Sequence, residues 1–115
     1  MRDKMEPQEN QNEWGVRTYL SGDDYALKSI VDVKVDAFIG LQPYTDFQDK
    51  EKEARFFFVI DPEKKRKTFR MSKTNELVCL KKYKIGRPQD LVGKILSLEV
   101  VKFGKRQGFV LASIK

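Results

Sequence analysis

The chain has 115 residues, of which 40% are apolar and 11% aromatic, so it can bury one hydrophobic core. No apolar run reaches the roughly 18 residues that a membrane-spanning helix needs, and residues 1–7 lack the apolar stretch of a signal peptide. The chain has one cysteine, Cys79, and therefore no internal disulfide. These features predict a cytoplasmic protein.

The chain has no histidine, which removes the usual general base near neutral pH and any His/Cys zinc cluster. Cys79 lies in an apolar run without a histidine partner, so we expect a buried structural thiol. No glycine-rich phosphate loop of a common pattern is present. The sequence therefore predicts a protein that is not an enzyme and that has no metal site and no cofactor.

The charges are divided unevenly along the chain. Residues 1–50 carry 6 basic and 10 acidic side chains, whereas residues 51–115 carry 17 basic and 7 acidic ones. Residues 1–16 are predicted to form a flexible, acidic leader, and residues 17–115 a single domain. A basic domain of this kind is typical of proteins that bind phosphate backbones, although a lysine-rich solubility surface is the alternative.

Five segments are predicted to be β-strands: residues 30–38, 55–60, 67–71, 95–103 and 109–114. In the first, apolar and charged side chains alternate with period two, which is typical of a half-buried strand. Residues 42–53 are expected to form a polar loop. Ser72 can cap a helix, and Gly86, followed by a proline, is expected to end it.

This order of elements is three strands, one helix and two strands, which is the order of the oligonucleotide/oligosaccharide-binding (OB) fold. We therefore predict a mostly β protein with a five-stranded, OB-like barrel and one helix between the third and fourth strands. An SH3-like barrel and a split α+β sandwich are the alternatives. In an OB-like barrel the ligand lies across the outer face of the second and third strands, between the loop after the first strand and the last hairpin.

Four short motifs are spread over residues 19 to 115. They are Tyr19-Leu20-x-x-Asp23-Asp24, Met71-Ser72-Lys73-Thr74-Asn75, Asp90-Leu91-Val92-Gly93-Lys94 and Phe103-Gly104-Lys105. Together they resemble the first turn, the helix start, the fourth-strand start and the last hairpin of a group of small phage and prophage proteins. The resemblance implies an OB-like fold and a place in phage DNA metabolism, in the cytoplasm of the host cell.

Basic and aromatic side chains are concentrated where such a barrel binds its ligand. Lysine and arginine neutralise phosphates, and aromatic rings stack on unpaired bases, each worth about 1–3 kcal/mol. The predicted nucleic-acid-binding residues are Lys34, Tyr44, Phe57, Lys64, Lys65, Arg66, Lys67, Arg70, Lys102, Lys105 and Arg106. Phe47 is a further candidate in the loop over residues 42–53, although Tyr44 and Phe47 could instead anchor that loop.

The phenylalanines of the second strand cannot all face the core. Phe69 in the third strand is assigned to the core, and its neighbour Arg70 then points outward. Phe56, Phe58 and Ile60 share one face of the second strand and Phe57 and Val59 the other, and we expect the face with three large apolar side chains to fill the core. Phe57 is then the predicted stacking platform, with burial under the leader or a partner subunit as the alternative.

The function that we predict is non-enzymatic binding of single-stranded DNA in replication, recombination or repair. One alternative is a subunit or inhibitor that uses the phenylalanine strand, residues 56–58, to bind a protein partner or a second copy of the chain. The other is an RNA-binding barrel, because the same basic and aromatic side chains would serve it.

Overall fold

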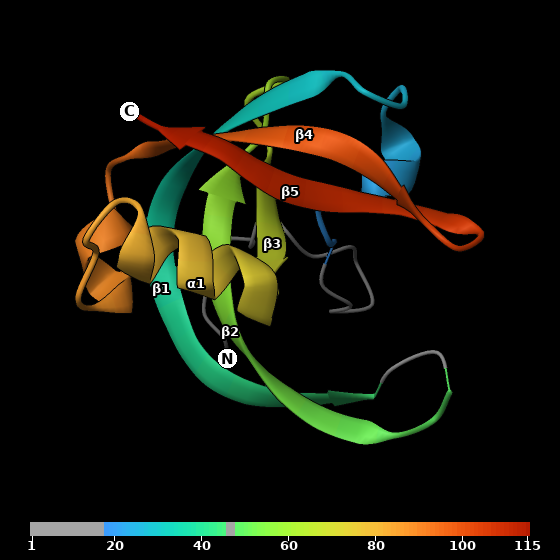
Figure 1. The fold of residues 1–115 in the computed structure, drawn as a ribbon, viewed down its shortest axis with the longest axis horizontal. Coiled ribbons are helices and arrows are strands. Elements are labelled where there is room, and N and C mark those ends of the chain that lie inside the picture. Colours follow the sequence, from blue (N-terminus) through green and yellow to red (C-terminus); the bar gives the residue numbers. More distant parts are fainter. Residues whose placement is uncertain (1–17, 46–47) are drawn as a thin grey trace, which may run out of the picture.

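The protein is described by a computed structural model of residues 18–45 and 48–115, and these residues form a mostly β structure with one five-stranded sheet (Figure 1). The strands are β1 (Ile30–Thr45), β2 (Glu51–Ile60), β3 (Arg66–Met71), β4 (Ile95–Phe103) and β5 (Arg106–Ile114). The helix α1 (Lys73–Lys81) follows β3, and the short 3-10 helices η1 (Gly22–Asp24) and η2 (Pro88–Leu91) precede β1 and β4. The predicted leader, residues 1–16, and Phe47 lie outside the described residues.

The sheet has the strand order β3-β2-β1-β4-β5, and all neighbouring strands are antiparallel. The predicted strands and the helix between the third and fourth strands are therefore confirmed. In the described residues β3 and β5 form no ladder with each other, so the sheet is not closed.

The strand β1 is central because it pairs with β4 at its start and with β2 from Lys34 onward. Its register with β2 shifts between Val35 and Ala37 and again between Phe38 and Gly40, where Gly40 has a φ of 124°. These irregularities bend the strand and allow the sheet to curl. Beyond them, β1 and β2 continue as a long curved pair of strands, which we call the hairpin arm and define by residues 41–45 and 48–52 (Figure 1).

The prediction of a polar loop over residues 42–53 was wrong for residues 42–45 and 51–53, which belong to β1 and β2, whereas residues 48–50 lie outside the strands. Tyr44 pairs with Lys52 and Thr45 pairs with Glu51 in regular antiparallel register. Most residues of this part are exposed, and few of its side chains reach the core. The sequence therefore lacks the apolar alternation that marks a strand packed on one face, although its main chain is paired.

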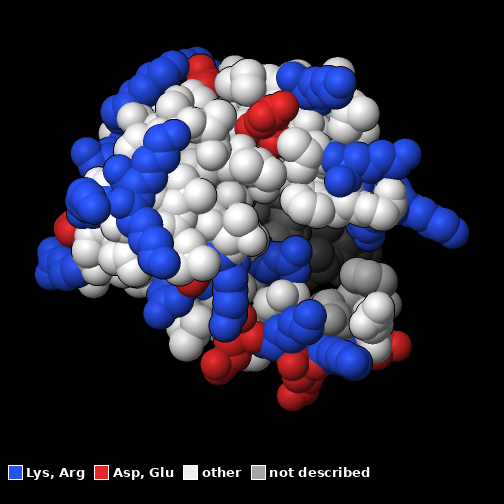
Figure 2. Space-filling model, viewed as in Figure 1, with Lys and Arg blue, Asp and Glu red and all other residues white. Residues whose placement is uncertain are grey.

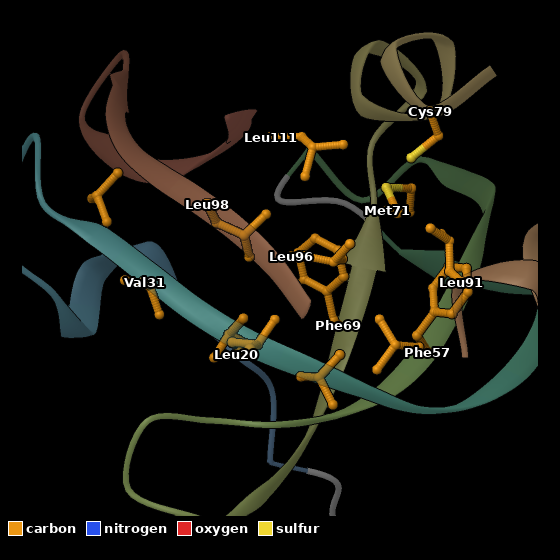
Figure 3. Close-up of a cluster of buried hydrophobic side chains, with 14 residues drawn as sticks. Leu20, Val31, Phe57, Phe69, Met71, Cys79, Leu91, Leu96, Leu98 and Leu111 are labelled. Carbon is orange, nitrogen blue, oxygen red and sulfur yellow. The ribbon is translucent and has the colours of Figure 1, made fainter. Parts of the chain in front are cut away.

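The core contains side chains from every strand, as Figure 3 shows for Val31, Phe57, Phe69, Leu98 and Leu111. The alternation in β1 places its valines inward and its charged residues outward, as predicted from the sequence. The helix α1 adds Cys79 and η2 adds Leu91 to the same cluster, together with Leu20 from the segment before η1. The burial predicted for Cys79 is confirmed, because this residue is 5% exposed.

Residues 18–25, which we call the strap, run between β3 and β5. At its start, the amide of Leu20 donates to the carbonyl of Thr68 at 2.9 Å, and the amide of Thr68 donates to Thr18 at 2.9 Å. At its end, the side-chain amide of Gln107 in β5 donates to the carbonyls of Gly22 and Tyr25 at 2.8 and 2.7 Å. The strap therefore connects the two edge strands that do not pair with each other.

The edge of β5 is also covered by one side chain of α1. The amide of Leu111 donates to Asn75 Oδ1 at 3.0 Å, and Asn75 Nδ2 donates to the carbonyl of Phe109 at 3.1 Å. Asn75 is 2% exposed. Its side chain thus satisfies one donor and one acceptor of an edge strand, as a neighbouring strand would do.

The helix α1 ends at Lys81, five residues before the predicted terminator Gly86. Lys84 adopts the left-handed conformation that was expected of a glycine, with a φ of 59°, and the amide of Ile85 donates to the carbonyl of Cys79 at 2.9 Å. The predicted cap is confirmed, because Ser72 Oγ accepts from the amide of Asn75 at 3.2 Å. None of the helices in the described part of the chain is long and apolar enough to cross a membrane.

Candidate nucleic-acid interface

Phe57 points into the core, so its predicted role as the stacking platform was wrong. It is 2% exposed, and its ring centroid lies 5.0 Å from that of Phe38. Phe57 pairs directly with Phe69 across β2 and β3. Directly opposite residues of an antiparallel pair lie on the same face of the sheet, so a core position for Phe69 requires one for Phe57. Phe56 and Phe58 are therefore the rings of β2 that point outward.

Three rows of residues cross the outer face of β1, β2 and β3. The pairing gives Lys34, Ile60 and Arg66 in the first row, Ala37, Phe58 and Thr68 in the second, and Gly40, Phe56 and Arg70 in the third. The hairpin arm curves, and its Tyr44 comes into contact with Phe56. We call this surface the aromatic–arginine face and define it by Tyr19, Tyr44, Phe56, Phe58, Arg66 and Arg70.

Two arginines of β3 lie on aromatic rings of this face. The guanidinium carbon of Arg70 lies 4.5 Å from the ring centroid of Tyr44, and that of Arg66 lies 4.1 Å from the ring centroid of Phe58. Arg66 also forms a salt bridge of 2.9 Å with Asp36, whereas the side chain of Arg70 is exposed. Flat guanidinium groups held on rings combine positive charge with a surface on which bases stack.

Phe56 forms the floor of the aromatic–arginine face. It is 3% exposed, and the rings of Tyr19 and Tyr44 both meet it edge to face, with centroids 6.2 Å away. Tyr19 comes from the strap and is 48% exposed, so it extends the aromatic surface beyond β3. The sequence-based prediction missed Tyr19, Phe56 and Phe58.

The connection between β2 and β3 is a turn built around Asp61. Its Oδ1 accepts from the amides of Glu63 and Lys65 at 2.9 and 2.8 Å, and Lys64 adopts a φ of 70°. Lys67 Nζ lies 3.4 Å from the buried Asp61 Oδ2, and its side chain is 16% exposed. Lys64 and Lys65 are exposed, as a role in binding phosphates requires, whereas Lys67 is engaged with Asp61.

The last hairpin presents the remaining predicted residues. Lys102 and Lys105 are exposed, and Arg106 NH2 forms a salt bridge of 3.1 Å with Asp23 of the strap. Tyr25, at the end of the strap, is half-buried. Its ring contacts Phe109 of β5 at a centroid distance of 6.2 Å, and burial, followed by the charges of Asp61, Asp24 and Glu63, raises the pKa of its hydroxyl. The strap therefore holds the last hairpin through the contact of Asp23 with Arg106.

The structure brings together part of the predicted set. Lys34, Tyr44, Arg66 and Arg70 share the outer face of β1–β3, and Lys64 and Lys65 lie at the turn beside it. Figure 2 shows lysine and arginine side chains spread over much of the surface seen in this view. The aromatic–arginine face with its basic surroundings is the candidate nucleic-acid interface.

Comparisons with protein-family models, with curated proteins and with solved structures found no match to this chain. They therefore add no support to the resemblance to phage and prophage proteins, and the argument for function depends on the described residues.

Proposed function

We propose that this protein binds single-stranded DNA across the aromatic–arginine face, without a catalytic step. The observation that carries the proposal is the pair of arginine–aromatic stacks on one outer face, Arg70 on Tyr44 and Arg66 on Phe58. Unpaired bases stack on such rings and guanidinium planes, whereas the bases of a duplex are already stacked on one another.

The strand order also supports this proposal. The order β3-β2-β1-β4-β5 is that of an OB-like barrel opened between its third and fifth strands. The aromatic–arginine face occupies the outer surface of β2 and β3, which is where such barrels bind oligonucleotides. The resemblance to phage and prophage proteins would place this activity in phage replication, recombination or repair.

The first test is fluorescence anisotropy of a labelled oligothymidine at two salt concentrations. Tyr44→Ala removes one stacking surface worth about 1–3 kcal/mol, so affinity should fall at least about fivefold. Arg70→Ala removes one phosphate contact, and the slope of log K against log salt should become shallower by about 0.7. No binding of the unaltered protein at low salt would refute the proposal.

Arg87→Ala is the matched control for the arginine variant. Arg87 is exposed in the segment before η2 and does not belong to the aromatic–arginine face. Both variants lower the net charge equally, so a general electrostatic attraction would weaken to the same extent in both. A larger loss for Arg70→Ala than for Arg87→Ala is expected if binding occurs at this face.

Competition experiments separate the alternative ligands. Unlabelled oligothymidine should displace the probe better than oligouridine or duplex DNA of the same length; preferential displacement by oligouridine would identify an RNA-binding protein instead. The alternative function, in which residues 56–58 bind a protein partner, is disfavoured. Phe56 and Phe57 are buried and are therefore not accessible to a partner.

A further inference from the structure

A second surface lies on the opposite side of β2 and β3 from the aromatic–arginine face. It is a pocket of about 220 Å³ between these strands, α1 and the segment that leads into η2. Its walls include Phe57, Met71, Cys79 and Leu91, which Figure 3 shows along one side of the buried cluster. The mouth is formed in part by Leu80, which is 50% exposed.

The size and lining of the pocket fit one large apolar side chain. A cavity of about 150 Å³ with apolar walls accepts a benzene molecule, so this pocket has room for a phenyl ring or a branched aliphatic group. Its polar wall is a pair of opposite charges that already satisfy each other, since Arg55 donates to both carboxylate oxygens of Glu76 at 3.3 and 3.2 Å. The wall therefore favours an uncharged group inside the pocket, because its two charges are paired with each other.

The two segments that form the mouth carry exposed basic residues. Leu80 is followed directly by Lys81 and Lys82, and the lining residues Ile85 and Gly86 stand between Lys84 and Arg87 in the sequence. These four cations are exposed, and Asp90 offsets only one of them by its salt bridge of 3.3 Å with Arg87. Figure 2 shows basic side chains bordering uncharged surface on the side of the molecule where α1 lies.

We propose that this pocket docks an acidic segment of a partner protein, which inserts one large apolar side chain between α1 and η2. The apolar walls bind the inserted side chain, and the exposed basic residues of the segments that form the mouth attract the acidic residues on either side of it. Leu77, which is 52% exposed one turn before Leu80, extends the apolar contact along α1. Because Phe57 and Met71 face the pocket while Phe56 and Arg70 face outward, a nucleic acid and this segment would bind to different surfaces at the same time.

The probe is a short synthetic peptide that has a central phenylalanine flanked by aspartate and glutamate residues and carries a fluorescent label. We expect saturable binding to the full chain. A second peptide with serine in place of phenylalanine should bind at least about tenfold more weakly, because burying a large apolar side chain is worth about 1.5–3 kcal/mol. Equal binding of both peptides would overturn the proposal, since charge alone would then explain the attraction.

Leu80→Asp places a negative charge at the mouth and should abolish binding of the phenylalanine peptide. Its matched control is Leu27→Asp, because Leu27 is a similarly exposed leucine, 44%, in the turn before β1. The control should bind the peptide as the unaltered protein does. Circular dichroism of both variants establishes that they are folded, and equal losses in both would overturn the proposal.

Cys79 provides a readout inside the pocket because it is the only cysteine of the chain. Burial, and next the charge of Glu76, raise the pKa of the Cys79 thiol, so little thiolate forms near neutral pH. The phenylalanine peptide should slow the reaction of this thiol with an aromatic disulfide reagent severalfold. No protection by the peptide would overturn the proposal. Free indole serves as a second probe, and protection by indole but not by the peptide would identify a small-molecule pocket instead.

The two proposals fail independently. Leu80→Asp should weaken the binding of oligothymidine no more than Arg87→Ala does, because both variants lower the net charge by one. Tyr44→Ala should leave the affinity for the peptide unchanged. A protein that binds the peptide but not oligothymidine would retain the docking pocket and lose the single-stranded DNA function.

Discussion

Replacing Asn75 by alanine should destabilise the fold because its side chain stands in for a missing strand at the edge of β5. The change leaves the amide of Leu111 and the carbonyl of Phe109 without their hydrogen-bond partners. Water does not easily replace these partners, because Asn75 is only 2% exposed. An unsatisfied buried group costs about 1–3 kcal/mol, so two such groups cost about 2–6 kcal/mol. The higher helix propensity of alanine offsets only about 0.5 kcal/mol of this loss in stability.

The assay is urea-induced unfolding, with Thr74→Ala as the matched control. Thr74 is the exposed neighbour of Asn75 in the first turn of α1, so the control changes helix propensity without removing the contacts to β5. We expect the free energy of unfolding to fall by at least about 1.5 kcal/mol in Asn75→Ala and to change by less than about 0.5 kcal/mol in Thr74→Ala. Equal values for the two variants would refute the reasoning.

A second variant tests the direction of the two hydrogen bonds. Asn75→Asp keeps an acceptor for the amide of Leu111 but places a second acceptor against the carbonyl of Phe109. Protonation of the new carboxyl restores a donor, and its buried position against a carbonyl raises its pKa above the ordinary value of about 4. The deficit of this variant relative to the unaltered protein should therefore shrink as the pH falls toward about 4. A deficit that is independent of pH would contradict the assigned orientation of the amide.

Three further predictions concern the strap, its tyrosine and the leader. Gly22→Ala should lower the free energy of unfolding by about 1–3 kcal/mol, because a Cβ at Gly22 would lie 2.6 Å from the carbonyl oxygen of Gln107. Gly86→Ala is the control and should change this free energy little, because a Cβ at Gly86 would have no other atom within 4 Å. The pKa of Tyr25 is raised in the folded state, so the free energy of unfolding should fall as the pH rises past about 10. Tyr25→Phe should remove this part of the fall, and identical pH profiles for the variant and the unaltered protein would contradict the prediction. Deleting residues 1–16, which carry four acidic and two basic side chains, a net charge of −2, should tighten binding of oligothymidine at low salt but not at high salt; unchanged or weaker affinity at low salt would contradict competition by the leader.

The strands and the core could be predicted because burial on one face leaves a period of two in the sequence. Val31, Val33 and Val35 show this pattern clearly, and they are buried as expected. The hairpin arm could not be predicted in the same way, because its paired residues are mostly exposed and carry no such period.

The orientation of β2 was mispredicted because its connection to β3 is one residue shorter than expected. The predicted strands, residues 55–60 and 67–71, leave a connection of six residues, in which Phe58 would face Phe69 and Phe57 would face Arg70. The turn has five residues, 61–65, so Ile60 pairs with Arg66 and Phe57 pairs with Phe69. A shift of one residue in the register moves every side chain of a strand to the other face of the sheet.

The contribution of the strap to the candidate site could not be predicted from the sequence. Tyr19 reaches Phe56 because Thr18 and Leu20 bond to the edge of β3, and this polar segment has no periodicity that would indicate such pairing. Tyr44, Arg66 and Arg70 were placed on the binding face by the order of the elements, and the structure brings these three residues onto one surface.

The strap also determines when this fold can be completed. Its Gly22 and Asp23 bond to Gln107, which is 85 and 84 residues further along the chain. During synthesis on the ribosome, β1, β2 and β3 emerge well before β5, so the strap has nothing to hold it at that end until the last hairpin has appeared. Contacts between such distant residues form late and slow the folding of β proteins. Nascent chains that stop before β5 should therefore remain sensitive to protease, and folding should become cooperative only when Gln107 has left the exit tunnel.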